Sequence, residues 1–374
     1  MTSKYNHIPV MKPLLPTVDK IAPYLSEIDN NRWYSNFGPL VVSLEERLEE
    51  YMGLERGTVA LVSSATSGLT MALQALGCKS NSSCAMPSWT FIATAAAARN
   101  AELTPHFVDV DPDSWAINPA DVLPIKNKIS AVVPVAPFGS AIKIEEWENF
   151  SNSTGIPVVV DAASCFDSFS QQKDFRISEI PVVLSLHATK AFACGEGGMI
   201  VCKNKELISR FKSMSNFGFI GEDAITGGGN SKLSEYSAAV GHAELDSWES
   251  KRSKFAELGA MYREKLGRVG VEYFASDKWI SPTISIKVEQ ENTFEVARMM
   301  SAEGVDTRRW WRQGCHYFEA FHECPREDLK VTEGLVKSVL GLPLWIGMRE
   351  WQVDRVVERL ENTLRLPVTT AMGF

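Results

Sequence analysis

Two segments early in the chain repeat apolar residues every three or four positions and close on a glycine, LEERLEEYMG (44–53) and SGLTMALQALG (67–77). This spacing places the apolar side chains on one face of a helix, and glycine commonly follows a helix end. The apolar stripes consist of Leu44, Leu48 and Tyr51 in the first segment and Leu69, Leu73 and Leu76 in the second. Both segments therefore predict amphipathic helices.

Short runs rich in valine and isoleucine follow, and most of them are apolar at every position. Strands that are buried on both faces and separated by helices are typical of a parallel sheet. We therefore predict an α/β fold with a mainly parallel central sheet flanked by helices. The runs are LTPHFVDVDP (103–112), AVVPVAPFG (131–139), IPVVVDAAS (156–164), PVVLSLHATK (181–190) and GGMIVCK (197–203).

The pattern changes after about residue 250. A long amphipathic helix is predicted over 247–270, a strand with alternating polar and apolar residues over 281–288, and helices near 292–304 and 350–364. These elements indicate a smaller C-terminal α+β domain. The first 35 residues carry four prolines and indicate an arm rather than a core element. The predicted organisation is an arm (1–35), a large domain (36–249) and a small domain (250–374).

The composition narrows the functional classes. The chain of 374 residues has a formal net charge of −8 and no long run of lysine or arginine, which argues against nucleic acid or an anionic membrane as a partner. No stretch of 18 residues is free of polar groups, and the first residues lack the apolar core of a signal peptide. The seven cysteines form no CxxC pair, so we expect reduced thiols and a cytoplasmic protein. A late group, Cys315, His316, His322 and Cys324, fits no zinc spacing, and no metal is expected.

Candidate chemistry stands at the ends of the predicted strands, where ligands bind in open α/β sheets. Asp161 follows IPVVV, and Lys190 follows VVLSLHAT. The run SSATS (63–67) opens a helix, and the aromatic residues Trp89 and Phe91 follow another strand. Each alone has an ordinary explanation: a turn residue, a solvated charge, a helix cap or a core aromatic.

Together these residue types match one ligand, pyridoxal 5′-phosphate (PLP). Its phosphate would bind the N–H groups of Thr66 and Ser67 and the hydroxyl of Ser185, and its aldehyde would form a Schiff base with Lys190. Asp161 would face the ring nitrogen. The ring would stack on Phe91 or Trp89, which point the same way if their segment is extended, so the spacing does not choose between them.

The same segments resemble, in the same order, the motifs of the DegT/DnrJ/EryC1/StrS family of sugar aminotransferases, which are fold-type I PLP-dependent transferases. The matching segments are SATSGLTMALQALG, PSWTFIATAAAA, FVDVDPDSWAINP, VVDAAS, SLHATKAFACGEGG, GGGNSKLSEYSAAVGHAELD and LGLPLW. The resemblance implies that Lys190 is the Schiff-base lysine and Asp161 the partner of the pyridine nitrogen. It implies that Thr66 and Ser185 bind the phosphate, with Ser67 beside them.

Four further positions follow from the resemblance. Phe91 falls on the family's ring-stacking aromatic, which leaves Trp89 for the sugar side. Asn230 falls on an asparagine that reaches the phosphate of the neighbouring subunit, which implies a homodimer with shared active sites. Ser164 stands where the family usually has Gln or His touching the cofactor's O3′, so a shorter hydroxyl replaces that contact.

Within the family, RWYSNFGPL, LHATKAF and SNFGFIG look most like the branch acting on nucleotide-linked 4-keto-6-deoxyhexoses. The expected reaction moves an amino group, by analogy from glutamate, to such a keto sugar for amino-sugar or O-antigen biosynthesis, with Lys190 as proton carrier. The alternative is a non-catalytic sensor of nucleotide sugars. A nicotinamide oxidoreductase is excluded because no GxGxxG follows a strand. Candidate substrate residues are Tyr34, Asn36, Arg308, Trp311 and His316.

Overall fold

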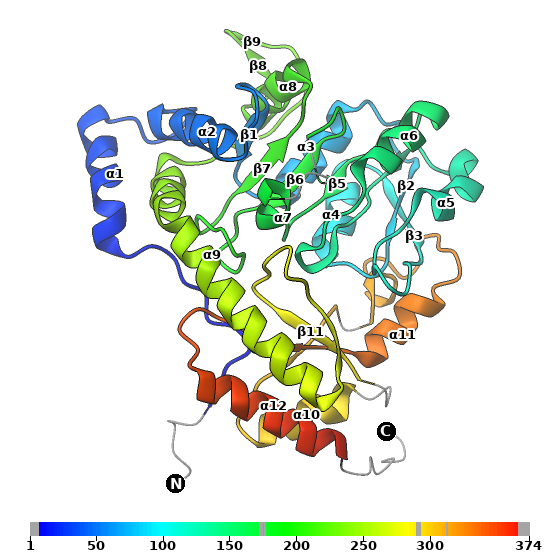
Figure 1. Ribbon diagram of the computed structural model, residues 1–374. Coiled ribbons are helices and arrows are strands. Elements are labelled where there is room, and N and C mark those ends of the chain that lie inside the picture. Colours follow the sequence, from blue (N-terminus) through cyan, green and yellow to red (C-terminus); the bar gives the residue numbers. More distant parts are fainter. Residues whose placement is uncertain (1–6, 172–174, 176, 289–292, 312, 366–374) are drawn as a thin grey trace.

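The structure is a computed structural model that describes residues 7–171, 175, 177–288, 293–311 and 313–365 (Figure 1). Its centre is formed by two sets of strands with the orders β1-β7-β6-β5 and β3-β2-β4. Single parallel bridges, Val132 with Val158 and Val135 with Asp161, join the two sets edge to edge. The strands are β1 (Val59–Val62), β2 (Ser83–Pro87), β3 (Thr104–Val108), β4 (Ala131–Val132), β5 (Val160–Asp161), β6 (Val182–Ser185) and β7 (Gly198–Val201).

Six of these strands run in one direction and β7 runs against them, because β7 pairs antiparallel with both β1 and β6 while all other pairs and bridges that join one central strand or its continuation to another are parallel. The prediction of a mainly parallel sheet is therefore confirmed. Strand β6 shows why its sequence is apolar throughout: Val182 and Leu184 belong to one hydrophobic core, and Val183 belongs to a second core on the opposite face.

Helices cover both faces of this sheet. Two of them begin at a side-chain cap, in which Ser64 or Asn204 accepts a hydrogen bond from the main-chain N–H three residues later. The helices of this part are α2 (Pro39–Tyr51), α3 (Ala65–Ala75), α4 (Ile92–Asn100), α5 (Pro119–Val122), α6 (Ile144–Thr154), α7 (Phe166–Gln171) and α8 (Lys205–Ser215), with short 3₁₀ turns η1 (Leu123–Lys128) and η2 (Pro137–Gly139). A hairpin, β8 (Phe219–Ile220) and β9 (Asp223–Ala224), projects beside α8 (Figure 1).

A second, antiparallel sheet lies below the first, with the order β10-β11-β13-β12 (Figure 1). Its strands are β10 (Glu272–Phe274), β11 (Ile284–Lys287), β12 (Arg308–Arg309) and β13 (Val339–Leu342). The accompanying helices are α10 (Thr293–Ala302), η3 (Cys315–Tyr317), α11 (Lys330–Ser338) and α12 (Glu350–Arg365). Among the residues described, no helix is both long and apolar enough to cross a membrane.

Helix α9 (Glu235–Val269) runs from the upper sheet to the lower one, as Figure 1 shows, and passes without a break through the expected boundary at residue 250. We propose that it links the two domains rather than belonging to one. The predicted arm contains a helix, α1 (Val18–Asn31), which packs on α9. Before it, Ile8 is fully buried and forms main-chain hydrogen bonds with Gly304 and Asp306. This segment is therefore fastened to the part of the fold that contains the second sheet, called the lower domain below.

Candidate active site

The register of three neighbouring strands assembles one side of the site. Gly198 at the start of β7 is paired with Val62 at the end of β1 and with Ser185 at the end of β6. Asp161 ends β5, and β5 runs parallel to β6. The residues that follow the carboxyl ends of β1, β5 and β6 therefore meet at one edge of the sheet, as expected for a ligand site in this fold class.

A cradle for an anion lies between Ser185 and the start of α3. The helix N-terminus presents N–H groups that have no partner within the helix, and its dipole favours a negative charge. Ser64 Oγ already accepts the Ser67 N–H at 3.1 Å, so the predicted use of that N–H by a phosphate would require the cap to move. The N–H of Thr66 belongs to the same first turn. The Ser185 hydroxyl accepts the His187 N–H at 3.3 Å and has lone-pair and proton capacity left.

Gly198 allows β7 to approach this helix start. A Cβ atom there would lie 2.6 Å from Ala65 N and 2.7 Å from Ser64 O, both main-chain atoms. We predict that Gly198→Ala destabilises the protein by about 1–3 kcal/mol, because the backbone itself must shift, and weakens retention of an anion. Gly267→Ala in α9 is the matched control, since nothing lies within 4 Å of its Cβ, and it should be neutral or stabilising. Urea unfolding of both variants measures the difference, and equal midpoints would contradict it.

Asp161 is a buried carboxylate without an ion-pair partner within 4.0 Å among the described residues. Its Oδ2 accepts the Thr94 hydroxyl at 2.7 Å, and its Oδ1 accepts the Ala163 N–H at 3.1 Å. Burial raises the pKa of Asp161, although the hydrogen bonds and Lys190 oppose this. A protonated ring nitrogen would supply the missing cation.

Lys190 lies on the same edge, and its Nζ donates to Ser164 Oγ at 3.0 Å. Burial lowers the pKa of Lys190, Asp161 acts in the opposite direction, and the positive charge of Arg308 lowers it further. A lowered pKa makes the neutral amine, which is the nucleophile and proton acceptor, available nearer neutral pH. Ser164, the position at which the sequence departs from the family, thus contacts the lysine directly in this structure.

The segment that carries the two candidate aromatics is not extended throughout, so the condition under which they would point the same way is not met. Thr90 N–H bonds the Ser88 carbonyl, which turns the segment before α4 begins. Trp89 is 0% exposed and packs against Trp115 and Trp311, whereas Phe91 is 62% exposed. An accessible face is needed for a ring to stack, so the structure favours Phe91 as the stacking residue and Trp89 as core.

The substrate candidates fall into different surroundings. Arg308 lies on β12 with its guanidinium 5.2 Å from the Trp310 ring, and its charge reaches Lys190. Trp311 stacks on Phe138 at 4.8 Å within an aromatic cluster between the domains. His316 is buried, and its Nδ1 lies 2.6 Å from Ser88 Oγ, which gives it a structural partner behind the strand end.

Two further candidates lie at the start of α2 and α9. Tyr34 stacks on Tyr236 at 6.2 Å, and its carbonyl accepts the Glu235 N–H. Asn36 is exposed in a left-handed conformation with φ of 60°. Asn230 is exposed beyond the β8–β9 hairpin and forms a single bridge with Asn216. The printed contacts of these three residues are with their neighbours and not with Lys190, so their roles stay predictions.

Thr94 was not singled out from the sequence, whereas Ser64 and Gly198 lie within two stretches that were, the run SSATS and the glycine-rich turn 195–198. Thr94 positions the Asp161 carboxylate, Ser64 caps α3, and Gly198 makes room for the helix start. Thr94 lies within the matched segment PSWTFIATAAAA, and Gly198 ends SLHATKAFACGEGG, so the motifs contained them. The pairing of Thr94 with Asp161 spans 67 residues and is visible only in the folded chain.

The arrangement fits PLP on its own chemistry. An anion cradle, an uncompensated buried carboxylate, an amine with a lowered pKa and an exposed aromatic ring occur together. No group of three or more possible metal ligands occurs in the part of the chain that the structure describes. The late cysteine and histidine group does not form one either.

Comparison with known proteins agrees with this arrangement. The model of the DegT/DnrJ/EryC1/StrS aminotransferase family matches residues 17–361. A dTDP-4-amino-4,6-dideoxy-D-glucose transaminase of Shigella dysenteriae is 30% identical over 370 residues, covering 95% of this chain and 98% of the relative. One from Escherichia coli is 28% identical over 366 residues, covering 94% and 98%. The crystal structure of DesI in the presence of its TDP-sugar product has a TM-score of 0.87 at 29% identity, covering 96% of this chain and 94% of DesI.

These matches span nearly the whole chain. They confirm the predicted fold class, a fold-type I transferase with a smaller C-terminal part, and PLP-dependent transamination as the enzyme class. They also confirm PLP as the expected cofactor. The chain belongs to the DegT/DnrJ/EryC1/StrS aminotransferase family.

Proposed function

We propose that this protein transfers an amino group from an amino acid, by family analogy glutamate, to a nucleotide-linked 4-keto-6-deoxyhexose. The observation that carries the reaction type is the pair of Lys190 and Asp161 on one strand edge, the first with a lowered pKa and the second without a cation. The relatives support the acceptor class. Transaminases named for a dTDP-linked 4-amino-4,6-dideoxy-D-glucose produce an amine at a carbon that was a ketone in the acceptor.

When bound, PLP supplies an electron sink for the carbanion formed at the substrate carbon. The residues of this chain then have separable tasks. Asp161, oriented by Thr94, keeps the ring nitrogen protonated. Lys190 would carry the proton that moves during transamination, because its Nζ lies beside Ser164 at the carboxyl-end edge of the sheet. Ser185 and the start of α3 would hold the phosphate, and Phe91 would cover the ring.

Arg308 supports recognition of a negatively charged substrate. Its guanidinium is exposed and close enough to Lys190 to lower the pKa of that amine. Both expected substrates carry negative charge, as the carboxylates of glutamate or the diphosphate of a nucleotide sugar, and arginine suits both groups. We propose Arg308 as an anion contact, whereas Tyr34, Asn36, Trp311 and His316 stay weaker candidates.

The decisive experiment offers the purified holoenzyme glutamate with dTDP-, UDP- and GDP-linked 4-keto-6-deoxyhexoses and identifies the products by mass spectrometry. We expect one nucleotide series to gain an amine with release of 2-oxoglutarate. A cofactor absorption spectrum that changes with glutamate while no sugar gains an amine would contradict the acceptor class. A spectrum that no amino donor changes would favour the non-catalytic sensor.

We propose a homodimer as the working form. Beside Asn230, four large apolar side chains on and around the β8–β9 hairpin are 42% to 63% exposed, which a second copy would cover. The exposed residues are Phe217, Phe219, Ile220 and Ile225. If Asn230 serves the partner's site, mixing inactive Lys190→Ala subunits with Asn230→Ala subunits should restore one complete site per mixed dimer. Activity no higher than that of the Asn230→Ala protein alone would contradict the shared site.

We propose the cytoplasm as the compartment. The seven cysteines are all free thiols in the structure, and burial raises the pKa of six of them, which keeps those thiols protonated and unreactive.

A further inference from the structure

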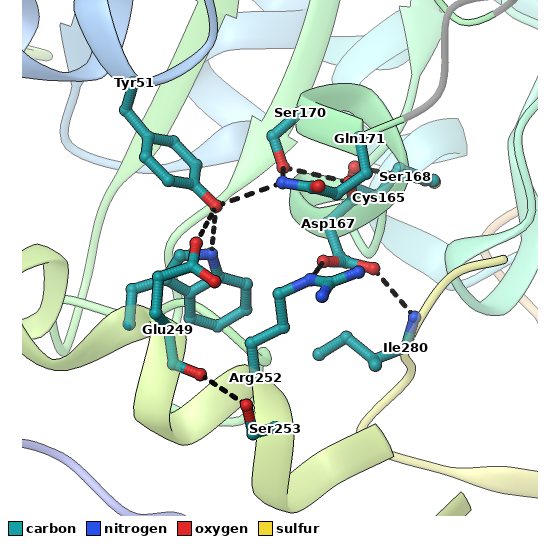
Figure 2. A network of polar contacts seen from close by, with 11 residues as sticks. Tyr51, Cys165, Asp167, Ser168, Ser170, Gln171, Glu249, Arg252, Ser253 and Ile280 are labelled. Atoms are coloured by element: carbon teal, nitrogen blue, oxygen red, sulfur yellow. Dashed lines mark hydrogen bonds and ion pairs between the residues drawn. The ribbon is translucent and has the colours of Figure 1, made fainter. Parts of the chain in front are cut away.

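A polar network outside the cofactor site connects helix α7, helix α9 and the loop at Ile280, as Figure 2 shows. Its centre is Asp167, on helix α7, which begins just after the Asp161–Ser164 segment. Asp167 is 1% exposed, and both of its carboxylate oxygens have partners. Oδ1 accepts Arg252 Nε of helix α9 at 2.5 Å, and Oδ2 accepts the Ile280 N–H at 2.9 Å. The carboxylate therefore ties the loop before β11 to the large domain.

The loop held in this way borders the active site. Gly139, with φ of 99°, lies between the two, because a Cβ atom there would be 3.3 Å from each of Ile280 O, Ser164 O and the Trp279 ring. Ser164 is the residue whose hydroxyl contacts Lys190. Further along the same loop, Pro282 lines a small cavity of about 20 Å³ together with Lys190. The loop over 279–282 thus lies beside Gly139, next to Ser164, and lines the same small cavity as Lys190.

The rest of the network does not hold this loop. Tyr51 bonds Glu249, Trp248 and Gln171, and burial raises its pKa to about 12. Among the hydrogen bonds of the described residues, Tyr51 is connected to Asp167 only through Gln171 and Ser170. The Ser170 hydroxyl donates to the main-chain carbonyl of Asp167 and does not contact its carboxylate. The network therefore has two halves. Tyr51 joins helix α2 to α9 and α7, whereas Asp167 holds the loop at Ile280.

We propose that Asp167 is a positioning residue for the acceptor half of the reaction: through Ile280 it holds the 279–282 loop as the wall of the active site against which the acceptor sugar is bound. This inference rests on the proposed function. An indole ring and a proline form an apolar surface, which suits the face of a deoxyhexose better than a carboxylate. The amino donor is smaller and reaches Lys190 without this wall. Loss of the tether should therefore affect the acceptor much more than the donor.

The test compares Asp167→Asn and Asp167→Asn/Arg252→Gln with Tyr51→Phe, all as holoenzymes. In the donor half-reaction, the rate at which glutamate changes the cofactor spectrum should stay within about twofold of wild type. In the acceptor half-reaction, KM for the keto sugar should rise by about tenfold or more, because a small displacement of a positioning group has large effects. Tyr51→Phe should change neither.

A second readout needs no activity. Lys278 is exposed in the same loop, so its rate of cleavage by trypsin in the cofactor-free protein measures how firmly the loop is held. Both Asp167 variants should be cut faster there, and Tyr51→Phe should be cut at the wild-type rate. Unchanged cleavage, or equal losses in both half-reactions, would overturn the proposal.

Asp167→Asn leaves the partly buried Arg252 without its carboxylate partner and so lowers stability, and the double variant removes that charge. Trp279→Ala, which leaves the buried pair intact, completes the test, since it should also raise the KM for the acceptor alone. Equal losses relative to wild type in the donor and acceptor half-reactions of Trp279→Ala would overturn the assignment of this loop as the wall. Failure of the proposed function looks different, because the wild-type protein itself would then aminate no keto sugar.

Discussion

Replacing Lys190 by alanine should lower kcat/KM for transamination by about 10⁴-fold or more, because one side chain provides both the covalent attachment and the proton carrier. Its Nζ reaches the open edge of the sheet next to Ser164, and burial lowers its pKa, so the amine is available as a base. Rapid-mixing spectroscopy with glutamate measures the loss. The cofactor should still bind, since the phosphate cradle and Asp161 are untouched.

Lys251→Met is a matched control for Lys190→Ala in the same surroundings. Lys251 lines the same small cavity, but its ammonium is paired with Glu244 and bonds the Leu14 carbonyl. Its replacement should weaken stability and leave the chemical step far less affected than loss of Lys190. Comparable losses of kcat in the two variants would contradict the assignment of Lys190 as the reactive amine.

The change of Asp161 to asparagine should lower kcat by about 10²–10³-fold, which is typical for removal of one preorganised electrostatic contact. The neutral amide cannot keep the ring nitrogen protonated. The local geometry should survive, because the amide oxygen can still accept the Ala163 N–H and Thr94 can accept from the amide nitrogen. Thr94 would then donate to Thr90, whose hydroxyl oxygen lies 2.8 Å away. Steady-state kinetics with the full set of substrates measures the loss.

In the cofactor-free protein, Asp161→Asn should increase the stability, although it lowers kcat in the holoenzyme. The pKa of Asp161 is raised in the folded state above its usual value of 3.8, so between the two values the folded chain binds more protons. Its stability therefore falls as the pH rises through that window, and the cost is fully present above it. Asp161→Asn removes this cost and should raise Tm at neutral pH, with a gap that closes as the pH falls toward 3.8.

Addition of cofactor should make wild type more thermally stable than Asp161→Asn, because only the aspartate can pair with the protonated ring nitrogen. Thermal unfolding with and without PLP over a pH series tests both statements. An Asp161→Asn protein that is less stable than wild type without cofactor at every pH would contradict the account of a buried, uncompensated charge.

Much of the chain was predictable because its signals are local. Continuous apolar runs predicted strands buried on both faces, as Val182–Leu184 show, and helical spacing predicted α2 and α3. Asp161 and Lys190 after predicted strands, the SSATS run with Ser185 and an aromatic at 89 or 91 together predicted the cofactor. The motifs then assigned the family, which the comparisons confirm.

Other features depend on contacts between residues far apart in the sequence. Whether Trp89 or Phe91 faces the ligand depended on the turn at Ser88, which a strand periodicity cannot predict. The helix α1 within the predicted arm is held by α9, more than 200 residues later, as the bond from Tyr24 to Asp246 shows. The local sequence, with four prolines in the first 35 residues, predicted an arm and carries no signal for this contact.

By itself the sequence determined the fold class and predicted the reactive lysine and its carboxylate partner, because strand ends and motifs lie within short stretches. Only the tertiary structure decided which groups surround them. Thr94 on Asp161, Ser164 on Lys190 and Asp167 on the loop at Ile280 join segments separated by 26 to 113 residues. Such pairings depend on how the sheet, α9 and the lower domain pack together, and this packing also sets the burial that raises one pKa and lowers the other.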